Sequence, residues 1–237
     1  MRRSGVRSSF GPPPSLFGTA IKPLAPKPSL KELWSFYGAD HGFVRTVYTN
    51  LHPIDGRMFR SSQPLPWQLR AWKQRYGLKT IINLRGERSP GIGIESRACA
   101  RLGLTLHSPR LYSRSPPVAA DLSALKQLFD TIEYPALLHC KSGADRAGMG
   151  AVLYRVLHLG HSVEDASREL HWRFGHMRGS HSGVLDFFLA QYVADTRNEP
   201  MGLIEWAETR YDPDQLKQRF RAGGWESLLA DRVLKRE

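Results

Sequence analysis

The stretch Pro135–Gly150, PALLHCKSGADRAGMG, decides the fold of this chain. It opens with a short apolar run typical of a buried strand, continues as a tight polar loop, and ends in small residues that favour a helix lying close to a sheet. A loop from a strand into a helix turns successive backbone N–H groups toward one point, and the helix N-terminus adds further donors. The stretch therefore predicts an anion-binding loop that begins at a cysteine.

The residue types in this loop suit a phosphate group. Arg146 follows the pair His139-Cys140 with five residues between. Its guanidinium can bind two oxygens at once, and the positive field favours the thiolate of Cys140, which is the nucleophilic form. We predict Cys140 as the nucleophile, Arg146 as the ligand of the phosphate and of the transition state, and His139 as a supporting residue that orients the loop. The predicted phosphate-binding residues between them are Lys141, Ser142, Gly143 and Ala144. The alternative is a buried structural cysteine in an ordinary strand-to-helix turn.

Outward from this stretch, predicted strands alternate with predicted helices, which indicates an α/β fold with a central, mostly parallel sheet flanked by helices. The predicted strands are Phe43–Leu51, Gly56–Ser61, Lys79–Leu84, Leu104–Leu111 and Ala136–His139. The predicted helices are Leu30–Gly38, Pro64–Tyr76, Ile94–Leu102, Val118–Ile132, Arg146–Leu159, Val163–Phe174 and Ser182–Ala194. Ser162 and Asp165 form a capping box before Val163–Phe174. Trp172 and Trp225 are predicted to pack in the core.

Composition divides the chain into three parts. Residues 1–29 are rich in Pro, Ser, Gly and Arg and are expected to form a disordered basic tail. Residues 30–197 are predicted to form the α/β domain, and residues 198–237 a C-terminal helical extension. The net charge is +12, and residues 1–30 supply +5 of it through five basic residues and no acidic one. The remaining 29 basic and 22 acidic residues give +7. This balance favours an anionic partner.

Other features exclude several classes of function. The two cysteines, Cys99 and Cys140, allow no disulfide framework and no zinc-ligand spacing, so we expect a reducing compartment. Cys99 is predicted to be a core residue. No stretch has the length of a signal peptide or of a membrane span, and we therefore expect a cytoplasmic protein. The basic tail lacks interleaved aromatic residues, so no nucleic acid is expected as a partner. The sequence leaves the oligomeric state open.

The run from His139 to Gly148, HCKSGADRAG, resembles the signature loop of the cysteine-dependent protein tyrosine and dual-specificity phosphatases. Two upstream runs, Met58–Pro64 (MFRSSQP) and Gly77–Arg85 (GLKTIINLR), resemble the small, atypical dual-specificity-like phosphatases of bacteria and fungi. The resemblance covers roughly residues 42–195. It implies a protein-tyrosine-phosphatase-like fold for the domain 30–197, a phosphocysteine intermediate, no metal and no cofactor.

The chain departs from this family at two places. The family usually has Ser or Thr directly after the arginine, where the hydroxyl helps the thiolate leave; here Ala147 occupies that position. The family also usually carries an aspartate general acid in the loop before the long helix, but Ser108–Pro117 contains no Asp or Glu. Asp145 is the remaining candidate, either as the general acid or as a residue that holds the loop. His107 is a weaker candidate, and Asp121 is predicted to be an N-terminal helix acid.

The sequence thus predicts a phosphatase that hydrolyses phosphate monoesters through a phosphocysteine, with a phosphorylated protein or a small anionic phosphate as substrate. Protein tyrosine or dual specificity is the leading expectation. Two alternatives remain: a phosphatase of phosphoinositides or inositol phosphates, and a phosphate-binding pseudophosphatase with little turnover, which Ala147 and the missing acid in the loop Ser108–Pro117 suggest.

Overall fold

The computed structural model describes residues 48–223. The predicted tail 1–29, the predicted helix Leu30–Gly38 and Trp225 lie outside these residues. Within them, a five-stranded sheet has the strand order β1-β2-β5-β3-β4. Only the pairing of β1 with β2 is antiparallel. The strands are β1 His52–Pro53, β2 Met58–Ser61, β3 Thr80–Asn83, β4 Thr105–His107 and β5 Ala136–His139.

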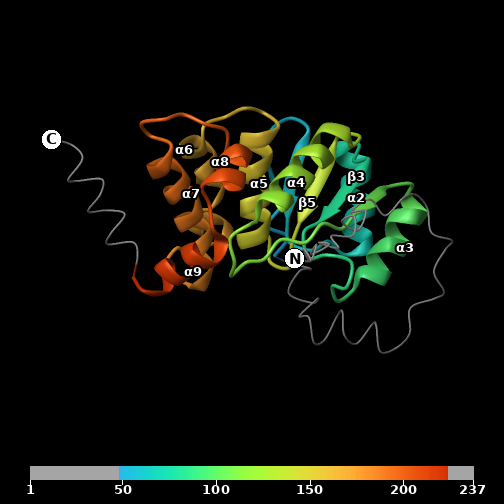
Figure 1. The fold of residues 1–237 in the computed structure, drawn as a ribbon. Helices are drawn as coiled ribbons and strands as arrows, with labels where there is room; N and C mark the ends of the chain where they lie inside the picture. The colour runs from blue at the N-terminus through green and yellow to red at the C-terminus, as the bar shows by residue number, and fades with distance from the viewer. Residues whose placement is uncertain (1–47, 224–237) are drawn as a thin grey trace, which may run out of the picture.

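Helices lie on both faces of this sheet, as Figure 1 shows. The helices that precede β5 are α2 Pro66–Tyr76, α3 Ile92–Leu102 and α4 Ala119–Thr131. Those that follow it are α5 Asp145–Leu157, α6 Val163–Ala166, α7 Val184–Asp195, α8 Leu203–Thr209 and α9 Pro213–Arg221. The predicted α/β architecture with a mostly parallel central sheet is confirmed.

The two faces of the sheet are separated by the alternation of side chains along each strand. Ile81 of β3 and Leu137 of β5 point toward α2 and α3, where they pack with Leu69, Trp72 and Cys99. Ile82 and Leu138, one residue further on, point toward the other face and pack with α4, α5 and α7. The predicted position of Cys99 in the core is confirmed, since its side chain is buried among these apolar neighbours.

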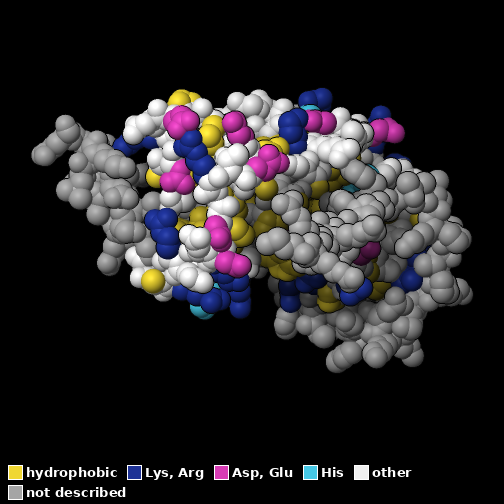
Figure 2. Space-filling view, in the orientation of Figure 1, with side chains coloured by type: hydrophobic (Ala, Val, Ile, Leu, Met, Phe, Trp, Pro, Cys, Tyr) yellow, Lys and Arg dark blue, Asp and Glu magenta, His cyan; other side chains and the backbone are white. Residues whose placement is uncertain are grey.

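The helices α8 and α9 pack on this same second face. Trp206 of α8 is completely buried and lies against Phe188 of α7, with ring centroids 5.5 Å apart. Leu216 of α9 belongs to the same apolar cluster. Figure 2 shows Lys and Arg side chains along the lower edge of this face, below α9 in the orientation of Figure 1.

The prediction of a strand at Phe43–Leu51 is wrong for residues 48–51, the part that the structure describes. These residues are not in a strand, and β1 begins at His52. Asn50 explains the difference. Its φ is 45°, in the left-handed region that an extended strand excludes. Asparagine tolerates this conformation better than most residues, and its side chain binds the loop after β5, as described below.

The helix predicted at Val163–Phe174 is shorter than expected. The Ser162 cap is confirmed, since its hydroxyl accepts a hydrogen bond from the Asp165 amide at 3.1 Å. The α-helix ends at Ala166, and 3-10 turns follow at Ser167–Glu169 and Trp172–Phe174. The carbonyl and carboxylate of Glu169 bind Arg60, so this segment is held by tertiary contacts instead of a helical ladder. The core position predicted for Trp172 is wrong: its side chain is 77% exposed.

Candidate active site

The predicted phosphate-binding loop lies where β5 ends and α5 begins. Cys140 directly follows β5 and is only 2% exposed. Since β5 runs parallel to β2 on one side and to β3 on the other, the carboxyl ends of all three strands meet here. Ligand sites of open α/β sheets form at this edge. The segment Ser61–Gln63 and the segment Asn83–Arg85 therefore flank the loop.

The carbonyl groups of the loop are all bound from outside. The Gln63 amide donates to the carbonyl of Lys141, and the Asn50 side chain donates to that of Ser142 at 3.0 Å. One guanidinium nitrogen of Arg60 donates to the carbonyls of Gly143 and Ala144, at 2.8 and 3.2 Å. These contacts fix the planes of the peptide groups, and with them the direction in which the N–H groups point.

The amide groups of the same loop have no such partners. Within residues 48–223, the backbone N–H groups of Ser142, Gly143, Ala144, Asp145 and Arg146 donate no hydrogen bond. Backbone donors in buried loops are nearly always paired with protein, water or a ligand. A run of N–H groups left unpaired while the neighbouring carbonyls are bound forms an anion-binding concavity, to which the N-terminus of α5 adds its dipole.

Gly143 is the residue that allows this shape. Its φ is 79°, and a Cβ there would lie 2.7 Å from the Ser62 amide nitrogen and 2.8 Å from the carbonyl carbon of Ser61. The loop thus runs against the backbone that follows β2, at a distance that excludes a side chain. Both its conformation and its close contacts therefore require glycine at this position.

Replacing Gly143 with alanine is expected to lower the free energy of unfolding by about 3 kcal/mol, through a strained φ and a contact with backbone that cannot move aside. Gly160→Ala is the matched control. Gly160 has a similar φ of 70° but open space around its Cβ position, so about 1 kcal/mol is expected there. Urea unfolding of both variants gives the comparison. Equal losses would show that the close packing of the loop contributes nothing.

Arg60 is the buried centre of the support beneath the loop. It is completely buried in β2, and its second nitrogen binds the Glu169 carbonyl at 2.6 Å and the Glu169 carboxylate at 2.9 Å. Glu169 also binds Arg155 of α5 at 2.9 Å, and the Phe174 ring lies 4.1 Å from the Arg60 guanidinium carbon. Burial lowers the pKa of Arg60, while Glu169 opposes that shift. A guanidinium remains charged under these conditions.

His139, for which the sequence predicts a supporting role, is the last residue of β5. The ring is fully buried, with Nε2 2.6 Å from Oε1 of Glu95 in α3, although the geometry of this contact falls short of a hydrogen bond. The other oxygen of Glu95 accepts a hydrogen bond from Asn83 at 2.7 Å. His139 Nδ1 lies 3.3 Å from the Cys140 carbonyl. These contacts connect the strand end under Cys140 to α3 and β3, which is compatible with orienting the loop.

The guanidinium of Arg146 is available for an anion. Its Nε atom is buried without a hydrogen-bond partner, and no other described residue forms an ion pair or a hydrogen bond with its side chain. A buried cationic nitrogen without a partner is costly unless a ligand supplies one. The unpaired amides lie in the loop before α5 and in its first turn, which also carries this side chain, so a single oxyanion can contact both.

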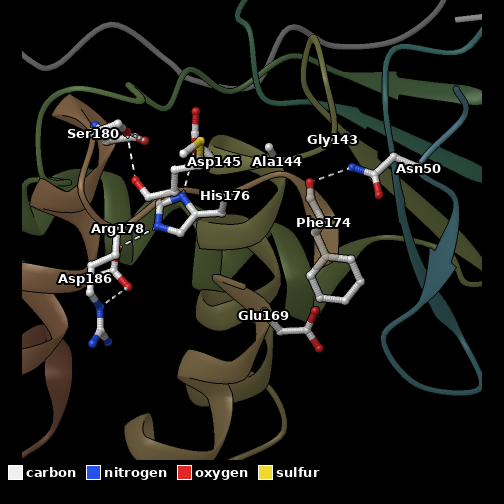
Figure 3. A network of polar contacts seen from close by, with 12 residues as sticks. Asn50, Gly143, Ala144, Asp145, Glu169, Phe174, His176, Arg178, Ser180 and Asp186 are labelled. Atoms are coloured by element: carbon white, nitrogen blue, oxygen red, sulfur yellow. Dashed lines mark hydrogen bonds and ion pairs between the residues drawn. The ribbon is translucent and has the colours of Figure 1, made fainter. Parts of the chain in front are cut away.

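Asp145 is bound to a residue that sequence reasoning missed. Its Oδ1 lies 2.7 Å from Nδ1 of His176, whose Nε2 lies 2.6 Å from Oδ2 of Asp186 in α7 (Figure 3). Burial alone would lower the pKa of His176, but the hydrogen bonds to Asp145 and Asp186 outweigh it and raise the pKa to about 9. The contact favours the alternative in which Asp145 holds the loop. The general-acid alternative stays a prediction.

The other acid candidates lie as follows. Asp121 accepts a hydrogen bond from the Val118 amide at 3.4 Å, which confirms it as an N-terminal acid of α4. Burial lowers the pKa of His107 at the end of β4 and so favours its neutral form, which is a poor acid. Ala147 is completely buried, and its methyl side chain offers no hydroxyl at that position. Within residues 48–223 no group of three or more His, Cys, Asp or Glu side chains could hold a metal ion.

No family model matches this chain. One curated protein, the dual specificity protein phosphatase TpbA of Pseudomonas aeruginosa, is 32% identical over 130 residues, which are 53% of this chain and 56% of that protein. The resemblance to the cysteine-dependent phosphatases is confirmed. The aligned part nevertheless spans little more than half the length of this phosphatase relative.

Solved structures of phosphatases are similar as well. A crystal structure of P. aeruginosa TpbA in complex with phosphotyrosine is 25% identical, covers 58% of this chain and 82% of its own, and has a TM-score of 0.47. The core catalytic domain of the PP-IP phosphatase SIW14 of S. cerevisiae is 20% identical, covers 65% and 96%, and has a TM-score of 0.46.

Five residues of the site escaped prediction: Asn50, Arg60, Glu169, His176 and Asp186. Arg60 lies within the run MFRSSQP that carries part of the phosphatase resemblance, and an arginine inside a buried strand was a usable signal, because buried arginines are almost always paired. The other four lie in loops or on helix surfaces where polar residues are ordinary. Their partners are far away in the sequence, and no local pattern identifies them.

Proposed function

We propose that this protein hydrolyses phosphate monoesters through a phosphocysteine at Cys140. One observation carries the proposal: at the start of α5, beside a buried cysteine, lie five successive amides and the Arg146 guanidinium, none of them bound by another residue of the range 48–223, while the loop carbonyls are bound by other segments. Such a preorganised arrangement stabilises the charge on the equatorial oxygens of a phosphoryl group in transfer. The dual-specificity phosphatase relative supports the same chemistry.

The reaction has two steps. The Cys140 thiolate attacks phosphorus, the P–S bond forms, and the P–O bond to the leaving group breaks. Water then attacks the phosphocysteine, releasing inorganic phosphate and restoring the thiolate. The amides of the loop and Arg146 bind the three equatorial oxygens in both steps. Since Ser108–Pro117 contains no carboxylic acid, aryl esters are expected to react faster than alkyl esters, because an aryl oxide leaves without a proton more easily than an alkoxide.

We propose that the substrate is phosphotyrosine or another phosphorylated side chain of a protein. We further propose that the enzyme acts in the cytoplasm. The choice of substrate is supported by the sequence relative, which is named as a dual specificity protein phosphatase. The net charge of +12 suits any phosphorylated partner, inositol phosphates included. Among the described residues, no helix is both long and apolar enough to cross a membrane.

The test is phosphate release from 4-nitrophenyl phosphate in the presence of EDTA. We expect turnover that EDTA does not affect and that orthovanadate, an analogue of the transition state, inhibits competitively. Phosphotyrosine peptide, phosphoserine peptide and inositol phosphates are then compared at equal concentration, and the first is expected to react fastest. Activity that appears only with added metal would contradict the mechanism.

Ala147 favours a second candidate, a phosphate-binding protein with little turnover, because no hydroxyl helps the thiolate leave. The same assay separates the two. A stoichiometric burst of 4-nitrophenol followed by almost no further release indicates trapped phosphocysteine, and hence an impaired enzyme. Binding of vanadate without any burst indicates a binding protein.

A further inference from the structure

The contact between Asp145 and His176 continues beyond the site already described. His176 has a side chain that is 1% exposed, and each of its ring nitrogens faces a carboxylate oxygen, Asp145 at 2.7 Å and Asp186 at 2.6 Å. A neutral imidazole donates from one nitrogen only. Its second nitrogen would then place its lone pair against the lone pairs of a carboxylate oxygen, which is repulsive. Both contacts are satisfied together only by the protonated ring.

The charges around His176 agree with this assignment. Asp145 faces it from the first turn of α5 and Asp186 from the first turn of α7, and Arg178 binds the other oxygen of Asp186 at 3.3 Å. Two carboxylates, one imidazolium and one guanidinium sum to zero. The raised pKa of His176, about 9, has the same origin in the two carboxylates. Removal of the imidazolium charge would leave the 6% exposed side chain of Asp186 and that of Asp145 without a shared cation.

The position of Asp145 links this cluster to the phosphate cradle. Asp145 is the first residue of α5, its own amide is one of the unpaired donors, and Arg146 follows it directly. An imidazolium and the N-terminus of a helix both attract a carboxylate. A carboxylate held in this way fixes the first turn of the helix and is a poor proton donor.

We propose that His176 is a positioning residue for the phosphate loop: through Asp145 it fixes the first turn of α5, and with it the direction of Arg146, and its hydrogen bond holds the Asp145 carboxylate out of proton transfer. The proposal rests on the proposed function and deepens it, because it decides between the two roles open to Asp145. It also joins α7, through Asp186, to the anion-binding loop.

The dependence of kcat/KM on the leaving group distinguishes the two roles open to Asp145, holding the loop and donating a proton. In kcat/KM assays, Asp145→Asn and His176→Gln are both expected to lose about tenfold, and by the same factor for 4-nitrophenyl phosphate and for phenyl phosphate, since misplacement of Arg146 affects both esters alike. A general acid matters only for the poor leaving group, phenoxide. If Asp145→Asn loses at least ten times more activity on phenyl phosphate than on 4-nitrophenyl phosphate, Asp145 is the acid and the proposal is overturned.

His158→Gln is the matched control. His158 binds Asp130 through Nδ1 at 2.8 Å, a similar pair on the surface, with ordinary contacts to Tyr134 and Tyr154 and none to the loop. Its kcat/KM is expected to stay within twofold of the original protein. The double variant Asp145→Asn/His176→Gln is expected to lose no more than either single variant, because both act through one contact. Fully multiplicative losses would overturn the proposal.

Measuring oxyanion affinity tests the positioning role of His176 independently of catalytic turnover. In a Cys140→Ser background, calorimetry with tungstate, a tetrahedral oxyanion, is expected to show about tenfold weaker binding after His176→Gln and no change after His158→Gln. If tungstate does not bind the unmodified cradle, the proposed function fails. If it binds equally well with and without His176, only the positioning role fails.

The pH dependence gives a last readout, which serves even if His176→Gln does not fold. In carbon-13 NMR of the folded protein, the His176 ring is expected to titrate near pH 9, and nearer its ordinary pKa after Asp145→Asn. Tungstate binding by the Cys140→Ser variant is expected to weaken as the pH rises through about 9, when His176 loses its proton. A ring that titrates below pH 7 in the folded protein would overturn the proposal.

Discussion

Replacing Cys140 with serine is expected to abolish phosphate release, with a loss of about 10⁴-fold or more in kcat. A serine hydroxyl is a weak nucleophile unless a neighbouring base removes its proton. Two titratable residues, His139 and Lys141, flank Cys140 in the sequence. The His139 ring is fully buried, with Nε2 facing Glu95 and Nδ1 facing the Cys140 carbonyl. His139 is therefore not expected to take the proton of the hydroxyl, whereas a thiolate is by itself a strong nucleophile.

The variant is expected to keep its fold and its affinity for tungstate, because the cradle consists of backbone groups and Arg146. Cys99→Ser serves as the control. This second cysteine is buried between α2, α3 and the sheet, and burial, with a smaller contribution from Glu95, raises the pKa of its thiol. It is expected to change stability but not the activity per folded molecule. Equal activity of the Cys140→Ser variant and the original protein would exclude a phosphocysteine.

Replacing Arg60 with methionine is expected to lower the free energy of unfolding by about 3–5 kcal/mol, the usual loss when one partner of a buried ion pair is removed. Methionine retains most of the volume but none of the donors. The carbonyls of Gly143 and Ala144 then lose their only contact from β2, and Glu169 keeps a single cation, Arg155. Urea unfolding measures the change, and kcat/KM is expected to fall together with stability.

Arg70→Met is the control for this substitution. Arg70 is exposed on α2, and no described residue forms an ion pair with it, so its replacement is expected to change stability by less than about 0.5 kcal/mol. A similar result for Arg60→Met would mean that the loop carbonyls find other partners, and that β2 does not set the shape of the cradle.

Much of the fold could be predicted because local signals and tertiary structure agree. The apolar run Ala136–His139 is β5 with the same bounds, and Gly77 and Gly103 end α2 and α3 in the left-handed conformation that favours glycine. The parallel sheet followed from the alternation of these elements. The loop itself was predictable because its function needs a cysteine, a glycine and an arginine at fixed spacing within one short segment.

The rest depends on contacts between residues that are distant in sequence. Asn50 reaches Ser142 across 92 residues, and Arg60 reaches Glu169 across 109. Hydrophobic periodicity carries no information about such pairs. The short α6 and the exposed Trp172 have the same cause, since the segment after Ala166 follows its tertiary partners and not its apolar pattern. The role of His176 could not be predicted because Asp145 and Asp186, the carboxylates that stabilise its protonated form, are not its neighbours in sequence.

The hydrogen bonds that other segments donate to the loop carbonyls order the loop before any anion binds. Side chains of β2 and of the segment before β1 orient the peptide groups, so the free energy of ordering the loop is supplied when the chain folds and not when an anion arrives. Folding and anion binding are therefore linked. An oxyanion in the cradle must raise the melting temperature of the protein, and any change that loosens the loop must weaken binding by the free energy needed to order it again.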